Sequence, residues 1–97
     1  MIEKSRREYL LHRIASKSSP AGGGCLEWVG ARSKRGYGLI RFSLEAGDRC
    51  KPPQTAHRAH YMAHYDVVLE KWQRVGHRCG NPSCVAIGHL FVERGDV

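Results

Sequence analysis

The feature that most constrains this chain is a cluster of cysteines and histidines near its C-terminal end. Four side chains that bind soft or borderline metals follow one another closely, as His77-x-Cys79-x4-Cys84-x4-His89. Residues 75–97 show little hydrophobic periodicity, so this segment needs an organiser other than an apolar core. Structural zinc takes four Cys and His ligands, and close spacing keeps the entropy of loop closure small. The pattern therefore predicts a zinc site.

The identity of the fourth ligand decides what other chemistry the segment can do. If His77 binds the metal, the segment is a structural knuckle alone. If Cys25 completes the site from upstream, His77 is left free beside a metal-pinned loop, where an imidazole can do acid-base work. Cys50 lies in a basic polar loop and is interpreted as a spare thiol, although it could replace Cys25.

The chain is short and basic, with 97 residues, a formal net charge of +7 and 41% hydrophobic residues. A domain of this size buries a modest share of its surface and commonly depends on metals or disulfides. The charged N-terminus predicts no secretory signal, which disfavours disulfides, and no apolar run predicts a membrane span. We expect no membrane partner and a location in the cytoplasm, or in the nucleus of a eukaryote. The net charge favours a polyanionic partner.

The positions of helix-breaking residues, together with the apolar spacing, predict one α+β domain with an N-terminal helical appendage. Apolar positions suit a short basic helix over residues 2–15, and Pro20 with the glycines after it cannot continue that helix. The appendage is assigned to residues 1–19 and the zinc-binding domain to residues 20–97.

Within the domain, two strands and a helix are expected. Residues 25–29 and 37–44 read as strands, joined into an antiparallel hairpin by residues 30–36. Thr55 is expected to cap a helix that runs to about Leu69.

The expected hairpin is strongly basic. Residues 28–44 contain no acidic side chain, and Arg32, Lys34, Arg35 and Arg41 all fall there. These cations could enter a groove of DNA and neutralise phosphates, with salt-dependent affinity. The alternative is a solvated basic loop.

Three histidines recur at helical spacing on the helix that Thr55 begins. His57, His60 and His64 could bind a second ion. We favour the alternative that they face loop backbone or solvent, because no acidic partners accompany them to orient the imidazoles.

Four segments occur in an order typical of a known family. They are GCLEWVG (24–30), RGYGLIRF (35–42), AHRAHY (56–61) and GHRCGNPSCVAIGHLFV (76–92). The series, which covers residues 20–97, resembles the small HNH, or His-Me finger, endonucleases with a zinc-binding loop, found in phages and among the His-Cys box homing enzymes. The resemblance implies a ββα-metal fold, in which a hairpin and a helix embrace one catalytic divalent cation. It also implies hydrolysis of phosphodiester bonds in double-stranded DNA.

The resemblance assigns roles to single residues. His77 matches the histidine that ends the first strand of the motif and acts as general base on water. Arg41 falls on the strand where some members place an arginine against the scissile phosphate. Mg²⁺ or Mn²⁺ would stabilise the charge that builds on the phosphate oxygens. The matching structural zinc ligands are Cys25, Cys79, Cys84 and His89.

The chain departs from the family pattern at two positions. Ala86 stands where the family often has an asparagine that braces the loop. The asparagine that holds the catalytic cation would fall just beyond Val97, and Asp96 could serve as a substitute oxygen ligand, since carboxylates suit Mg²⁺. Alternatively, the chain is a fragment, or it is an inactive zinc module that binds DNA or a protein partner.

A single small domain offers few base contacts. Sequence-specific cleavage would therefore require a homodimer or a larger context, and a monomer would nick one strand.

Overall fold

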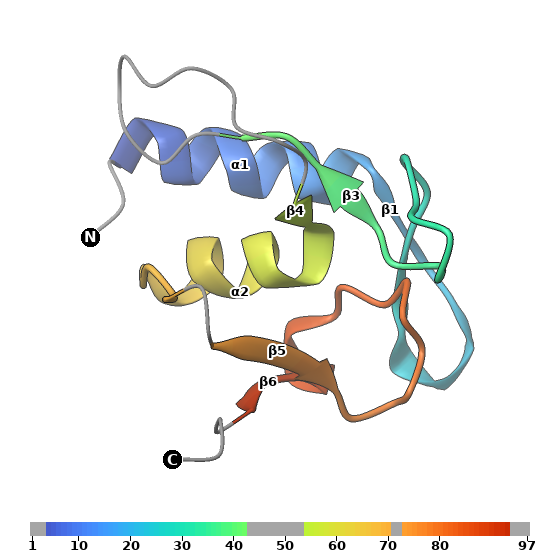
Figure 1. Cartoon of the computed structure of the whole chain (residues 1–97). Helices are drawn as coiled ribbons and strands as arrows, with labels where there is room; N and C mark the ends of the chain where they lie inside the picture. Colours follow the sequence, from blue (N-terminus) through green and yellow to red (C-terminus); the bar gives the residue numbers. More distant parts are fainter. Residues whose placement is uncertain (1–3, 43–53, 71–72, 94–97) are drawn as a thin grey trace.

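Two helices and a strand hairpin stack as three layers (Figure 1). Helix α1 (Lys4–Ser16) lies along helix α2 (Ala56–Tyr65). The antiparallel hairpin of β5 (Arg74–His77) and β6 (Leu90–Glu93) packs on the other side of α2. This computed structural model describes residues 4–42, 54–70 and 73–93. The α+β class expected from the sequence is confirmed.

The core forms where the two helices meet. Helix α1 contributes Leu10 and Ile14, and α2 contributes Ala59, Met62 and Ala63 to one buried cluster. The alanines let the two helix axes approach closely, because interaxial distance depends on the side chains at the contact. The helix expected as an appendage thus shares its core with the rest of the domain.

Helix α2 ends earlier than expected, at Tyr65 rather than near Leu69. Asp66 adopts a left-handed conformation with φ 55° and donates its backbone N–H to the carbonyl of Met62. Val67 also donates its N–H to that carbonyl, at 3.1 Å. These bonds satisfy a terminal carbonyl of the helix and turn the chain away from its axis.

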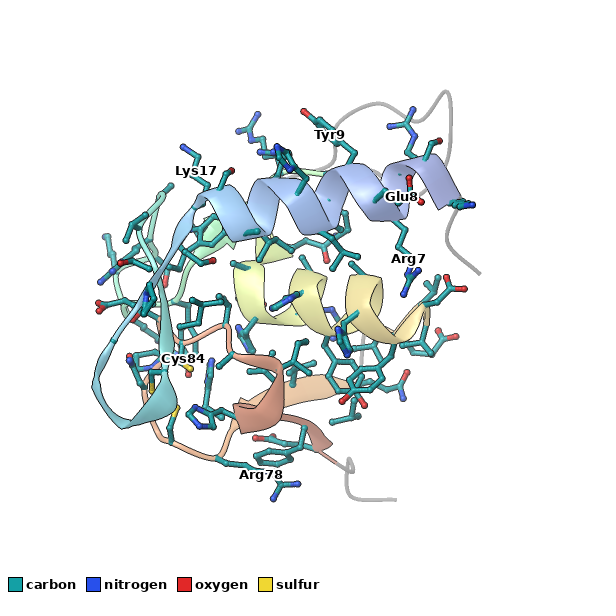
Figure 2. The ribbon with its side chains drawn as sticks, turned by 180° about the vertical axis from the view of Figure 1, so that it is seen from behind. Arg7, Glu8, Tyr9, Lys17, Arg78 and Cys84 are labelled. Carbon is teal, nitrogen blue, oxygen red and sulfur yellow. The ribbon has the colours of Figure 1, made fainter. Side chains whose placement is uncertain are left out.

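Arg7 on α1 forms hydrogen bonds with backbone carbonyls at the same end of α2. Its Nε donates to the carbonyl of Ala63 at 2.6 Å, and its Nη2 donates to the carbonyl of His64 at 2.9 Å. In Figure 2 the Arg7 side chain reaches from α1 toward the C-terminal end of α2. A cation at this end of a helix also complements the helix dipole.

The predicted hairpin between residues 25–29 and 37–44 is wrong. Strand β2 (Leu26–Trp28) pairs antiparallel with β1 (Ser18–Pro20), which lies in the stretch expected to be only a break. The glycines that suggested a break, over Gly22–Gly24, form the turn between these two strands. Gly23 and Gly24 have φ values of 74° and 78°, a conformation that other residues rarely adopt.

Strand β3 (Leu39–Ile40) pairs instead with β4 (Gln54–Thr55). Both edges of β2 are already occupied, one by β1 and the other by the chain around Cys84, so β3 does not lie along β2. The indole of Trp28 is buried. A Cβ on Gly30 would lie 2.9 Å from this ring, and one on Gly38 would lie 2.6 Å from it. The expected connecting loop and the expected second strand therefore both pack against the indole.

Candidate metal centre and adjacent pocket

Four predicted zinc ligands meet at one point of the structure. One ligand atom from each of Cys25, Cys79, Cys84 and His89 lies within 4.8 Å of all the others. His89 Nδ1 is 3.5 Å from Cys84 Sγ and 3.7 Å from Cys25 Sγ. Sulfur and nitrogen ligands on one tetrahedral zinc ion lie about 3.6 Å apart, as follows from the usual bond lengths. The cluster can hold a metal ion, and its spacing is compatible with structural zinc.

Backbone hydrogen bonds bring the two parts of this cluster together, although they lie far apart in the sequence. The chain around Cys84 runs beside β2, with Val85 donating its N–H to the carbonyl of Leu26 at 2.7 Å. Trp28 donates its N–H to the carbonyl of Ser83 at 2.9 Å. These bonds place Cys84, which is fully buried, next to the cysteine that precedes β2.

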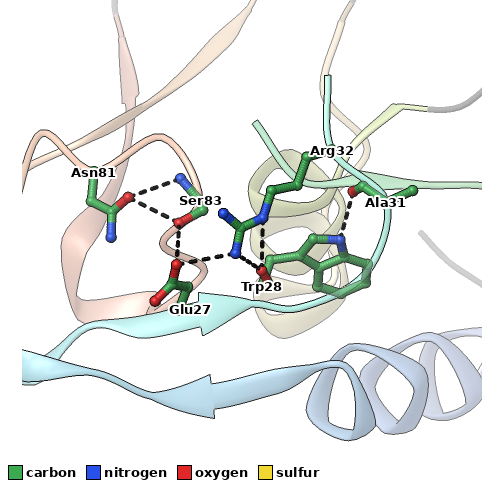
Figure 3. Close-up of polar contacts among 6 residues, drawn as sticks. All are labelled: Glu27, Trp28, Ala31, Arg32, Asn81 and Ser83. Atoms are coloured by element: carbon green, nitrogen blue, oxygen red, sulfur yellow. Dashed lines mark hydrogen bonds and ion pairs between the residues drawn. The ribbon is translucent and has the colours of Figure 1, made fainter. Parts of the chain in front are cut away.

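A polar network reinforces this junction (Figure 3). Glu27 Oε1 accepts from Arg32 Nη2 at 3.0 Å and lies 3.5 Å from the hydroxyl of Ser83. That hydroxyl lies 3.0 Å from Asn81 Oδ1, which also accepts the Ser83 N–H at 3.1 Å. Arg32 donates further to the carbonyl of Trp28. Arg32, expected to contact DNA, is thus held within the domain.

Contacts among the thiols of the cluster shift Cys25 and Cys79 in opposite directions, because the pKa of Cys25 is raised while that of Cys79 is lowered. Desolvation first, and then the side chains of Cys79 and Cys84, raise the pKa of Cys25 above its ordinary value. Three adjacent thiolates without a cation would repel one another, whereas a metal ion stabilises all of them in the ionised form. The chemistry of the donor set therefore fits a bound cation.

His77 lies beside the cluster but does not belong to it. It is the last residue of β5 and pairs with Leu90 of β6. Its Nε2 lies 2.8 Å from the carbonyl oxygen of Cys84. A carbonyl only accepts hydrogen bonds, so Nε2 carries the proton and Nδ1 keeps its lone pair. Burial lowers the pKa of His77, while the bond to Cys84 partly opposes this shift. The neutral imidazole has one nitrogen available as a base.

His77 lines a pocket of about 420 Å³ next to the metal centre. Its ring packs against the ring of His57, with centroids 4.3 Å apart, and Tyr37 stacks within 6.1 Å of it. Two charged side chains, Arg74 and Glu93, also line this pocket. They are cross-strand partners on β5 and β6.

His57 forms part of the pocket wall and is only 6% exposed. Its Nε2 donates to the carbonyl of Val75 at 2.8 Å, whereas its buried Nδ1 has no partner among the described residues. Burial and, to a smaller extent, the nearby His77 lower the pKa of His57 to about 4. The side chain is therefore neutral at pH 7.

The three helical histidines do not form a second metal site in the described structure. His57 faces Val75, His60 Nδ1 bonds the carbonyl of Val85, and His64 is exposed. His60 and His64 therefore face loop backbone and solvent, as the sequence interpretation expected, whereas His57 is buried and bonds a strand carbonyl.

The other predicted site residues are scattered. Arg41 does not line the pocket of His77 but a separate cleft beside α1. Lys34 and Arg35 are exposed on the loop before β3. Asp96 and Cys50 lie outside the described residues. The arginine that shares a pocket with His77 is Arg74, which the sequence analysis did not select.

Sequence reasoning missed Arg74 and Glu93 because their pairing depends on a hairpin with a long connection. Residues 78–89 separate the paired strands, so no short turn marks the register. The usable signal would have been the short apolar run Leu90-Phe91-Val92, which a charged residue, Glu93, follows.

The described residues establish a Cys₃His cluster and an α+β fold, while the ββα-metal motif is not established. A hairpin is present, but the helix packed on it, α2, precedes the hairpin in the chain. Comparison with family models, curated proteins and solved structures found no match to this chain. No helix in the described parts has the length and apolar character needed to cross a membrane.

Proposed function

We propose that the protein is an endonuclease that hydrolyses double-stranded DNA, with His77 as general base and zinc as a structural ion. The observation that carries this proposal is the hydrogen bond between His77 Nε2 and the carbonyl of Cys84. It holds the proton on Nε2 and leaves the lone pair of Nδ1 for a water molecule. The resemblance of residues 76–92 to the zinc-loop HNH enzymes supports the same assignment.

His77 would act on the water that attacks a phosphodiester. As the oxygen of water bonds to phosphorus, Nδ1 takes the proton and the bond from phosphorus to the leaving oxygen breaks. The aromatic rings of His57 and Tyr37 pack against His77, so they restrict the plane of its imidazole. A base held in one orientation needs no further ordering in the reaction.

The pocket has a donor suited to the divalent cation that the family resemblance implies. Glu93 is the only carboxylate among the described residues that line it. The carboxylate reaches over Gly76, where a Cβ would lie 2.6 Å from Glu93 Oε1. Mg²⁺ is commonly bound by one or two carboxylates together with water and phosphate oxygens. Glu93 would hold the cation, which when bound would stabilise charge on the phosphate oxygens.

Arg74 would take the role in phosphate binding that the sequence assigned to Arg41. It is exposed at the start of β5 and lines the same pocket as His77. A guanidinium can donate two parallel hydrogen bonds to the oxygens of a phosphate.

Zinc would have a structural role and would take no part in the cleavage reaction. It would bind Cys84, whose carbonyl accepts the hydrogen bond from His77. The metal would therefore preserve the tautomer and the place of the base, in a segment that lacks a large apolar core.

Cleavage of supercoiled plasmid in Mg²⁺ or Mn²⁺ tests this function. His77→Ala should lower the nicking rate by about 100-fold or more, the usual effect of losing a general base. His64→Ala is the matched control, because His64 is exposed on α2 and lies outside the pocket. Zinc content should be unchanged in both variants.

Equal nicking by the wild type and His77→Ala would exclude His77 as the base. If neither protein nicks the plasmid while both retain zinc and bind DNA, the domain is a binding module and not a nuclease.

A further inference from the structure

We propose that the cleft between α1 and β3 is a second contact site for DNA, one that binds the sugar-phosphate backbone. The inference rests on the DNA-binding part of the proposed function and is independent of cleavage. The cleft has a volume of about 330 Å³ and lies apart from the residues around His77. Its lining includes three cationic side chains and three large apolar ones, which are Arg13, Lys17, Arg41, Trp28, Leu39 and Ile40.

The described residues that line the cleft carry positive charge and no negative charge. Among the described residues, no carboxylate lines it and none forms an ion pair with Arg13, Lys17 or Arg41. Cations gathered at one low-dielectric cleft repel one another and focus a positive potential outward. An anion bound between them would remove this repulsion, so the charge distribution favours an anionic ligand.

One of the cations is already held in place. Arg13 Nη1 donates to the backbone carbonyl of Arg41 at 2.6 Å, and its guanidinium lies 5.8 Å from the centroid of the Tyr9 ring. Its other N–H groups have no protein partner in the described structure. An arginine ordered before binding loses less side-chain entropy when it bonds a phosphate.

The floor of the cleft distinguishes the DNA backbone from an unstacked base. The Trp28 side chain is only 2% exposed, and its Nε1 donates to the carbonyl of Ala31 at 2.9 Å. The indole face is therefore covered and cannot stack on a base. An apolar floor beneath a cationic rim matches deoxyribose flanked by phosphates, and backbone contacts of this kind carry no sequence information.

Arg41 lines this cleft and is held close to α1. Its carbonyl bonds Arg13, so its own backbone is tied to α1, while its exposed side chain lines the cleft. We assign Arg41 to DNA-backbone binding and not to the scissile phosphate.

The salt dependence of DNA binding tests this assignment. Binding of a labelled duplex is measured by fluorescence anisotropy with zinc-loaded protein, without Mg²⁺ or Mn²⁺, at several salt concentrations. Each phosphate contact contributes about 0.9 to the slope of log Kobs against log salt. Lys17→Gln and Arg41→Gln should each lower the slope by about this amount and weaken binding by about eightfold at 0.1 M salt.

Lys4→Gln is the matched control, because Lys4 is an exposed cation at the start of α1 and does not line the cleft. Its slope should equal that of the wild type. The inference is overturned if neither cleft variant changes the slope, or if Lys4→Gln lowers it equally, since a general charge effect would then suffice. The result stands apart from the plasmid assay, because a protein that does not cleave can still show the predicted slopes.

Discussion

His57 is a buried residue whose protonation would destabilise this domain. Its Nε2 bonds a carbonyl, its Nδ1 is buried, and the His77 ring lies against it. A second proton on this ring would place an unsatisfied charge in the core. The sequence showed only a histidine at helical spacing, and its burial became visible once β5 was placed over α2.

We predict that His57 makes the domain less stable in acid. Its pKa is about 4 in the folded protein and near 6.5 when unfolded, so the unfolded chain binds more protons between these values. The free energy of unfolding should therefore fall as the pH drops from about 6.5 toward 4, by about 3 kcal/mol from this group. Urea unfolding of the wild type and His57→Gln across this range measures the effect.

The comparison with His57→Gln separates His57 from the zinc ligands, which lose metal in acid in both proteins. The loss of stability in acid should be smaller in the variant. Parallel pH curves for the two proteins would show that His57 does not titrate as described.

Helix α2 is the element on which the other layers depend. Its position was predictable, because Thr55 occupies the N-cap position and the apolar spacing marks the buried face, although the Thr55 side chain makes no capping hydrogen bond. Its end was not, since the Arg7 guanidinium that closes it comes from a distant part of the chain. Strand pairing was less predictable still. Strand β2 bonds β1 on one edge and the distant chain around Cys84 on the other, which leaves no edge for β3.

We predict that Arg7→Gln destabilises the domain. The shorter amide cannot reach both carbonyls at the end of α2, and hydrogen bonds from a charged group contribute about 1.5–3 kcal/mol. Chemical unfolding followed by circular dichroism should show a loss of about this size. Lys4→Gln makes the same type of change on the same helix and should leave stability within about 0.5 kcal/mol of the wild type. Equal stability of the two variants would refute the role given to Arg7.

At the scale of the whole molecule, the Cys₃His cluster joins the two halves of the chain. Cys25 comes from the turn before β2, and the other three ligands come from the connection between β5 and β6. In a domain of 97 residues, a metal that closes such a long loop constrains the unfolded chain strongly. Zinc should therefore contribute to the stability of the entire fold.

We predict that Cys25→Ser abolishes stoichiometric zinc binding and lowers the melting temperature, whereas Cys50→Ser has neither effect. Serine keeps the size of the side chain but is a poor zinc ligand. Metal analysis and thermal unfolding of the purified variants measure both quantities. Loss of zinc from Cys50→Ser alone would move the fourth ligand and would reopen the role of His77.

The sequence by itself determined the local part of this protein. The spacing of Cys79, Cys84 and His89 brings three ligands within reach of one ion, because few bonds separate them. Only the tertiary structure decided that Cys25 joins them, that Arg74 and Glu93 share a pocket with His77, and that Arg41 does not. These outcomes depend on which distant backbone groups pair and where the indole of Trp28 is buried. Local spacing in the chain does not encode such choices.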